Sequence, residues 1–155
     1  MALARARAGP TASLLWLATA CSATWGGSVR APRASIGLVI LLVEDDEDVR
    51  EMLKLTLEMS GYAVDVAMNG SAALEALDRQ RPCLVILDLV MPVMDGWQVL
   101  AQMKARQLGD IPVCVISALS GRSPSEAVAS LGKPFDTSEL LAVAARYCSP
   151  PVAPG

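Results

Sequence analysis

The sequence predicts an α/β sandwich built around a parallel β-sheet. Short apolar runs alternate along the chain with stretches whose apolar residues recur at helical spacing, and this alternation is typical of a parallel sheet covered by helices. Most of the runs are continuously apolar, as expected of strands that are buried on both faces. The chain has 155 residues and is 53% hydrophobic. That length suits one domain, and that composition excludes a chain that is disordered throughout.

The same alternation gives the expected order of the elements. The acidic residues 46–48 suit the first turn of a helix, where the helix dipole favours negative charge, and Gly61 is a typical helix stop. Pro82 and Pro112 introduce two of the strands. Strands are expected at 38–43, 63–66, 83–87 and 113–116, and helices at 46–59, at 71–79, from 96 onward, weakly at 124–130, and from a cap at Asp136 through Tyr147.

Charge and composition exclude several classes of function. Residues 38–155 carry nine basic and sixteen acidic residues, a net charge of −7, whereas a nucleic-acid-binding face is basic. The absence of histidine excludes histidine-based acid–base catalysis, serine–histidine triads and histidine-ligated zinc. The four cysteines form no Cys-x-x-Cys motif. Cys83 and Cys114 fall in or beside expected strands, so both are predicted to be small apolar core residues.

Residues 1–36 differ in composition from the rest of the chain. They contain four arginines and no acidic residue, and the stretch from Ala12 to Ala20 is apolar. This pattern resembles a secretory signal peptide that ends near Cys21, but the stretch is too short to span a bilayer. We favour a disordered extension or an upstream start codon, because the remainder looks cytoplasmic. The expected division is therefore an extension at 1–36, a folded domain at 37–149 and a disordered tail at 150–155.

Acidic residues follow two of the apolar runs. Glu44 and Asp45 come directly after the first run, and Asp88 follows the run at 83–87. Because the carboxyl ends of parallel strands meet at one edge of a sheet, these carboxylates are expected to converge. Taken alone, Glu44 and Asp45 could begin a solvated acidic turn, but Asp88 stands between apolar neighbours. Mg²⁺ prefers carboxylate oxygens and water, so the sequence predicts a Mg²⁺ site, to which the Val90 carbonyl could contribute.

The same edge suits a phosphoryl group. An aspartate carboxylate can attack phosphorus and form an acyl phosphate, so Asp88 is the candidate nucleophile. Ser117 ends another apolar run and could donate to a phosphoryl oxygen, and Lys133 could pair with the phosphoryl group as a point charge. Each has an ordinary interpretation when it is taken singly. A serine at a strand end usually belongs to a turn, and a lysine before a proline is usually solvated.

Together, these motifs resemble the receiver domain of two-component response regulators, the CheY-like family. The resemblance covers about residues 37–148, and it implies a flavodoxin-like (βα)5 doubly wound parallel sheet. It also implies Mg²⁺ bound by Glu44, Asp45, Asp88 and the Val90 carbonyl, with Ser117 and Lys133 on the phosphoryl group. The segments that carry it are Leu42-Val43-Glu44-Asp45-Asp46, Leu87 to Gly96, Ser117-Ala118, and Lys133-Pro134-Phe135, usually with a cis bond before the proline.

The resemblance implies a phosphoacceptor and not an enzyme, with at most slow self-dephosphorylation. The phosphoryl group would come from the phosphohistidine of a histidine kinase or from a phosphotransfer protein, and the output would be a changed surface for a downstream protein partner. We expect a cytoplasmic protein with no nucleic-acid partner, and no membrane partner unless residues 1–21 act as a signal.

The sequence departs from the family between Ser117 and Lys133. Only fifteen residues separate them, fewer than the family usually has for its fourth helix and fifth strand. Residues 129–132 are not expected to supply a full apolar strand, which would leave strand four as an exposed edge. An alternative is therefore a degenerate receiver-like interaction module that no longer switches. A third hypothesis, a metal-dependent phosphatase, is disfavoured because Val90 stands where such enzymes usually place a second aspartate.

Overall fold

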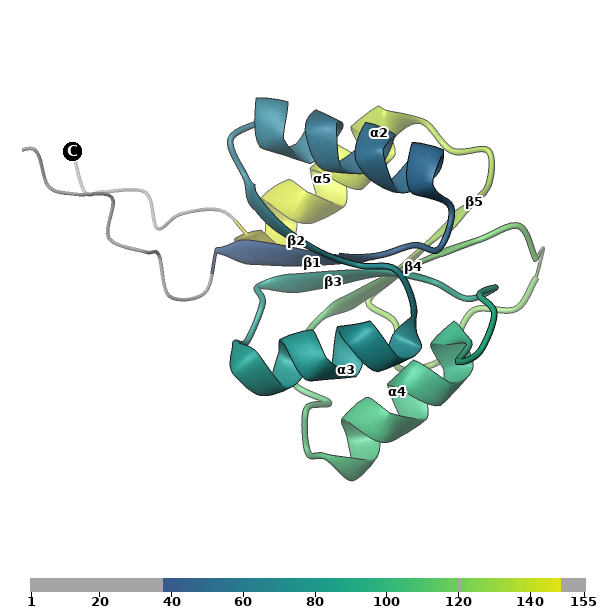
Figure 1. Cartoon of the computed structure of the whole chain (residues 1–155). Coiled ribbons are helices and arrows are strands. Elements are labelled where there is room, and N and C mark those ends of the chain that lie inside the picture. The colour runs from purple at the N-terminus through teal and green to yellow at the C-terminus, as the bar shows by residue number, and fades with distance from the viewer. Residues whose placement is uncertain (1–37, 120, 149–155) are drawn as a thin grey trace, which may run out of the picture. The chain divides into compact units, whose positions relative to one another are not determined.

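The computed structural model describes residues 38–119 and 121–148. Five parallel strands form one sheet in the order β2-β1-β3-β4-β5, and helices cover both of its faces (Figure 1). This arrangement confirms the flavodoxin-like fold class. The strands of the described residues are β1 (Val39–Val43), β2 (Ala63–Ala67), β3 (Leu84–Asp88), β4 (Val113–Ser117) and β5 (Ala129–Gly132), and the helices are α2 (Glu47–Met59), α3 (Gly70–Arg79), α4 (Gly96–Ala105) and α5 (Thr137–Cys148).

Alternate residues of the inner strands face opposite layers, which produces two apolar cores. On one face, Ile40 and Leu42 of β1 belong to a buried cluster with residues of α2 and α5. On the other face, Leu41 and Val43 belong to a cluster with residues of α3 and α4. Figure 1 shows the same division of the helices between the two faces. All five residues of β3 and all five of β4 are buried, which explains why these runs lack a polar alternation.

Short polar side chains begin the helices that carry or adjoin the site. Asp46 accepts a hydrogen bond from the Val49 backbone N–H at 3.1 Å and thereby caps α2. Asp95 caps α4 in the same way. The expected cap of the last helix is also present, because Asp136 accepts from the backbone N–H of Ser138 at 2.8 Å. These caps fix the loops that leave β1, β3 and β5.

The segment between β4 and β5 differs from the sequence prediction. The weak helix predicted at 124–130 is wrong. The prediction that 129–132 would not supply a full apolar strand is confirmed, because the strand found there has four residues that alternate between partly buried and exposed. Residues 129–132 form β5, which pairs in parallel with residues 114–117 of β4. Ala129 and Leu131 pack against the core beneath α5, whereas Ser130 and Gly132 are exposed. A four-residue strand with this alternation needs only two apolar side chains, and it covers the edge of β4 that was expected to be open.

The structure also corrects the prediction for Cys83, which forms a disulfide with Cys148 and is not a free thiol. The two residues are 65 positions apart in sequence, so only the fold brings them together. Cys114 is buried and free, as predicted. The extension predicted at 1–36 and the tail predicted at 150–155 lie outside the described residues. None of the helices in the described ranges combines the length and hydrophobicity needed to cross a bilayer.

Candidate metal and phosphoryl-binding site

The strand register brings the three predicted carboxylates together. Val43, the last residue of β1, pairs with Leu87 of β3, so the next residues along both strands, Glu44 and Asp88, adjoin each other. One carboxylate oxygen each from Glu44, Asp45 and Asp88 can be chosen so that all three lie within 4.8 Å of one another. Glu44 is 1% exposed and Asp88 is 4% exposed, whereas Asp45 is exposed to solvent. The cluster therefore has two buried members and one that faces outward.

Lys133, which directly follows β5, brings a compensating positive charge to the three carboxylates. Its Nζ lies 2.9 Å from Glu44 Oε2 and 2.6 Å from Asp88 Oδ2. The expected cis peptide bond is present between Lys133 and Pro134. The three carboxylates of Glu44, Asp45 and Asp88 and the ammonium group of Lys133 together carry a net charge of −2. A divalent cation with oxygen ligands would neutralise that charge, so the donor set fits Mg²⁺.

Burial and charge shift the titration of this group of side chains. Loss of hydration raises the pKa of Glu44, and the Asp88 charge raises it further, although the hydrogen bond from Lys133 opposes both effects. Burial alone would lower the pKa of Lys133, but its hydrogen bonds to Asp88 and Glu44, and their charges, outweigh burial and raise it. The carboxylates thus keep the lysine charged, and the lysine limits the cost of burying the carboxylates.

The backbone after β3 holds Asp88 in place. The Val90 N–H donates to Asp88 Oδ1 at 2.8 Å, and the Leu89 N–H donates to the Ile116 carbonyl of β4 at 3.2 Å. A Cβ placed on Gly96 would lie 2.5 Å from the Asp88 carbonyl oxygen, so only glycine fits where α4 begins. Asp88 therefore has one oxygen on a backbone amide and the other on Lys133. The role of the Val90 carbonyl as a metal ligand stays a prediction.

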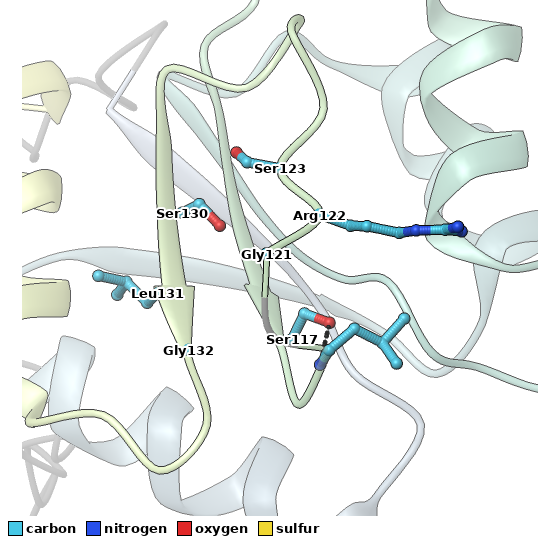
Figure 2. Close-up of a pocket in the computed structure, with 8 residues that line it drawn as sticks. Ser117, Gly121, Arg122, Ser123, Ser130, Leu131 and Gly132 are labelled. Carbon is cyan, nitrogen blue, oxygen red and sulfur yellow. Dashed lines mark hydrogen bonds between the residues drawn. The ribbon is translucent and has the colours of Figure 1, made fainter.

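Ser117 is the last residue of β4, beside the end of β3. Ser117 is 3% exposed. Its hydroxyl oxygen accepts a hydrogen bond from the Leu119 N–H at 3.0 Å, which is the dashed line in Figure 2. A hydroxyl that accepts in this way can still donate its own proton. The Lys133 N–H donates to the Ser117 carbonyl at 2.8 Å, so the backbone ties these two predicted site residues together.

A pocket lies beside Ser117, over the segment that follows β4. It has a volume of about 300 Å³, and Ser117, Gly121, Ser123 and Ser130 contribute to its lining (Figure 2). The predicted helix at 124–130 would have formed part of this region. The pocket therefore lies on the β4–β5 side of the site, next to Ser117.

Arg50 is a residue of this site that the sequence interpretation missed. Its Nη1 donates to the backbone carbonyls of Glu44 at 3.0 Å and of Asp45 at 3.3 Å. It reaches back from the first turns of α2 to the loop that carries the acidic pair. The sequence shows that Arg50 lies a few residues after the acidic pair. It does not show the contact, because backbone carbonyls are present at every residue and leave no pattern of side-chain types.

Comparisons with proteins of known sequence agree with this site. The family model for the response regulator receiver domain matches residues 40–145. Response regulator MprA of Mycobacterium leprae (strain TN) is 41% identical over 111 residues, which cover 66% of this chain and 47% of MprA. Transcriptional regulatory protein PrrA of Mycobacterium tuberculosis (strain ATCC 25618 / H37Rv) is 38% identical over 109 residues, covering 66% of this chain and 46% of PrrA. The chain thus spans about half the length of these relatives.

Solved structures show the same fold. The receiver domain of sensor histidine kinase PA1611 from Pseudomonas aeruginosa PAO1, with a magnesium ion in its active-site cleft, has a TM-score of 0.66 at 26% identity and covers 74% of this chain and 99% of that one. Response regulator TrrA from Thermotoga maritima, in complex with Mg²⁺-BeF, has a TM-score of 0.64 at 31% identity and covers 70% and 97%. With the family model matched across the strands and helices that build the site, this chain belongs to the response regulator receiver domain family.

Proposed function

We propose that this chain accepts a phosphoryl group on Asp88 from a histidine kinase or phosphotransfer protein, and that it signals through a surface that binds a downstream protein. The observation that carries the proposal is the placement of Asp88. Its carboxylate is buried at the end of β3, within reach of two further carboxylates and hydrogen-bonded to Lys133. A structural aspartate has no need of this charge-dense, sheet-edge setting.

In the proposed reaction, a carboxylate oxygen of Asp88 attacks phosphorus, and the bond to the donor nitrogen breaks as the acyl phosphate forms. The Val90 N–H and Lys133 orient the carboxylate through its two oxygens. Lys133 can then exchange its contact with Asp88 for one with a phosphoryl oxygen. Ser117 can donate its hydroxyl proton to another phosphoryl oxygen, since it lies at the end of the neighbouring strand.

Mg²⁺, when bound by Glu44, Asp45, Asp88 and the Val90 carbonyl, would offset the negative charge of the incoming phosphoryl group. The structures of PA1611 with magnesium and of TrrA with Mg²⁺-BeF support this assignment by similarity. The chain has no histidine that could act as a general base toward water beside Asp88, and we propose a phosphoacceptor with at most slow self-dephosphorylation. A histidine kinase donor would place the reaction in the cytoplasm.

Intact mass spectrometry after incubation with acetyl phosphate tests this proposal. The full chain should gain one phosphoryl adduct when Mg²⁺ is present and none in excess EDTA. Asp88→Asn should gain none. Asp95→Asn is the matched control, because Asp95 caps α4 in the same loop but lies outside the carboxylate cluster, and it should still be modified. An adduct of equal yield on Asp88→Asn would overturn the assignment of the nucleophile.

A second candidate is the degenerate interaction module, which phosphorylation no longer switches. The observation that favours it is the connection between β4 and β5, which contains no helix among its described residues. Amide hydrogen exchange of residues 113–135, measured with and without beryllofluoride and Mg²⁺, separates the two candidates. Slower exchange around Ser117 and Lys133 supports a switching receiver, whereas ligand binding with unchanged exchange supports the module.

A further inference from the structure

The disulfide lies at the edge of the sheet opposite the phosphoryl site. Cys83 immediately precedes β3, and its N–H donates to the carbonyl of Val39, the first residue of β1, at 2.9 Å. Cys148 is the last residue of α5. Their Cα atoms are 5.4 Å apart, within the range for unstrained disulfides. The cross-link therefore joins the C-terminal end of α5 to the start of the strand that carries Asp88.

One fully buried side chain in each turn of α5 faces the sheet. Leu140, Ala144 and Cys148 are all at most 1% exposed and follow one another at four-residue spacing, so they form one buried stripe. A leucine buries more apolar surface than an alanine or a cysteine, and the hydrophobic contribution scales with that area. In the last turn, Cys148 therefore buries less apolar surface than Leu140 does in the first turn. The partly buried Tyr147 also packs against the core there, and the disulfide adds a covalent link to the same turn.

We propose that Cys83–Cys148 is a thiol–disulfide exchange site for dithiol reductants, and that its redox state sets how firmly the last turn of α5 is held on the sheet. The cytoplasm keeps most thiols reduced, so a cross-link in a protein of that compartment would open and close with redox conditions. This inference rests on the proposed function for the cytoplasmic location alone, and its test does not involve the phosphoryl group.

The exposure of the two cysteine residues decides the route of the exchange. Cys83 is partly exposed, whereas Cys148 is 1% exposed, so a thiolate of the dithiol attacks the Cys83 sulfur. The disulfide bond breaks and Cys148 leaves as a thiolate, which takes a proton from water. The second thiol of the reductant then displaces Cys83, which leaves a cyclic disulfide and two protein thiols. The Val39 carbonyl, 3.4 Å from Cys83 Sγ, can accept a hydrogen bond from the new thiol.

The disulfide lies far enough from the phosphoryl site for its reduction to affect the end of α5 alone. Asp88 ends β3, whereas Cys83 precedes it, and α5 runs for twelve residues between the Lys133 end and Cys148. At a rise of about 1.5 Å per residue, that helix is about 18 Å long. Reduction should therefore loosen residues near 148 without disturbing the ion pairs of Lys133.

The test compares the oxidised and reduced full chain. After denaturation, iodoacetamide should leave Cys83 and Cys148 unmodified in the oxidised protein and modify both after dithiothreitol, with a Cys83–Cys148 peptide present only before reduction. Hydrogen exchange of residues 141–148 in the native protein should be at least tenfold faster after reduction. Exchange of residues 84–90 should stay unchanged. The double variant Cys83→Ala with Cys148→Ala is the control and should exchange like the reduced protein with or without dithiothreitol.

Two results would overturn the proposal. One is modification of both Cys83 and Cys148 after the protein has been equilibrated with oxidised glutathione, which would mean that the pair does not form. The other is a cross-link whose reduction leaves the exchange of 141–148 unaltered. Both tests use the wild-type chain, so they stand even if the double variant fails to fold.

Discussion

β3 and β5 bring residues to the same edge of the sheet, but the two strands are packed differently. All five residues of β3 are buried, whereas β5 alternates between partly buried and exposed residues. The side chain of Asp88, at the end of β3, is 6% exposed, compared with 27% for Lys133, which follows β5. Asp88 is thus held by the core, and Lys133 is held by polar contacts at the margin of the core.

The glycines show the same contrast. A Cβ on Gly96 would lie 2.8 Å from the Leu89 Cα and closer still to the Asp88 carbonyl, whereas a Cβ on Gly132 would meet nothing within 4 Å. Packing leaves no room beside β3 and ample room beside β5. The difference teaches that a receiver domain can shorten its β4–β5 segment without moving the carboxylates, because those carboxylates depend on β1 and β3.

Gly96→Ala should have the largest effect, because the added methyl group would meet backbone atoms that cannot rotate away. Overpacking of this kind costs typically about 1–3 kcal/mol, and we expect the upper end of that range. Denaturant unfolding measures the loss. The phosphoryl adduct should also form more slowly, since the β3–α4 loop must shift around Asp88. A variant as stable as wild type would show that this side of the site is not closely packed.

Lys133→Met should cause the next largest loss of stability, because it leaves Glu44 and Asp88 buried side by side without a counter-charge. Breaking a fully buried pair costs about 3–5 kcal/mol, and the partial exposure of Lys133 reduces our expectation to about 1–2 kcal/mol. Adding Mg²⁺ should restore part of the loss, since the cation takes over the charge compensation. Thermal unfolding with and without Mg²⁺ measures both effects.

The cost of Lys133→Met should depend on pH. Burial raises the pKa of Glu44 above its ordinary value of 4.5, so the folded state binds this proton more tightly than the unfolded state. Stability therefore falls as pH rises from 4.5 through the raised pKa, and removing the lysine should steepen that fall. The pKa of Lys133 is itself raised above 10.5, so its stabilisation is fully present at neutral pH and is lost as pH rises from 10.5 through that raised value. A deficit that grows toward acidic pH would contradict this assignment.

Arg50→Met should have a smaller effect on stability and a specific effect on metal binding. Arg50 fixes the backbone of Glu44 and Asp45, and loss of such a supporting contact typically weakens metal binding by about 10-fold or more. Lys54→Met is the matched control one turn further along α2, where the only described ion pair is the 3.9 Å contact with Glu51. Equal Mg²⁺ affinities for both variants would remove Arg50 from the site.

Gly132→Ala should have the smallest effect. Its Cβ would enter open space in a strand, so the change in unfolding free energy should stay within about 0.5 kcal/mol. Gly96→Ala and Gly132→Ala add the same methyl group beside β3 and in β5, so together they compare how closely the two strands are packed. Equal losses in the two variants would contradict the contrast between β3 and β5.

The sequence predicted the site better than it predicted the segment beside it. Glu44 and Asp88 were found because each comes at the end of a buried apolar run. Such runs predict parallel strands, and the carboxyl ends of parallel strands meet at one edge of the sheet. The pairing of β5 along the edge of β4 was not predicted, because only Ala129 and Leu131 face the core, which is too short a signal in a segment that also contains Gly132. The helix predicted at 124–130 was wrong because pairing with β4 satisfies the backbone of residues 129–132 instead.

Two further contacts had no sequence signal. The Cys83–Cys148 disulfide joins residues 65 positions apart, so its pairing depends on where the start of β3 and the end of α5 meet. Arg50 acts through backbone carbonyls, which every residue possesses. Local patterns therefore recovered the residues whose chemistry is carried by side-chain type, and they missed contacts that the tertiary fold creates.

Calorimetric titration of Mg²⁺ into wild type, Asp45→Asn and Ser117→Ala tests the central claim most directly. The claim is that the β1–β3 side alone builds the metal site, while Ser117 on β4 serves the phosphoryl group. Wild type should bind one Mg²⁺, Asp45→Asn should bind it more than about tenfold more weakly, and Ser117→Ala should bind it as wild type does. Wild type that binds no Mg²⁺, or a Ser117→Ala variant that loses as much affinity as Asp45→Asn, would contradict the account.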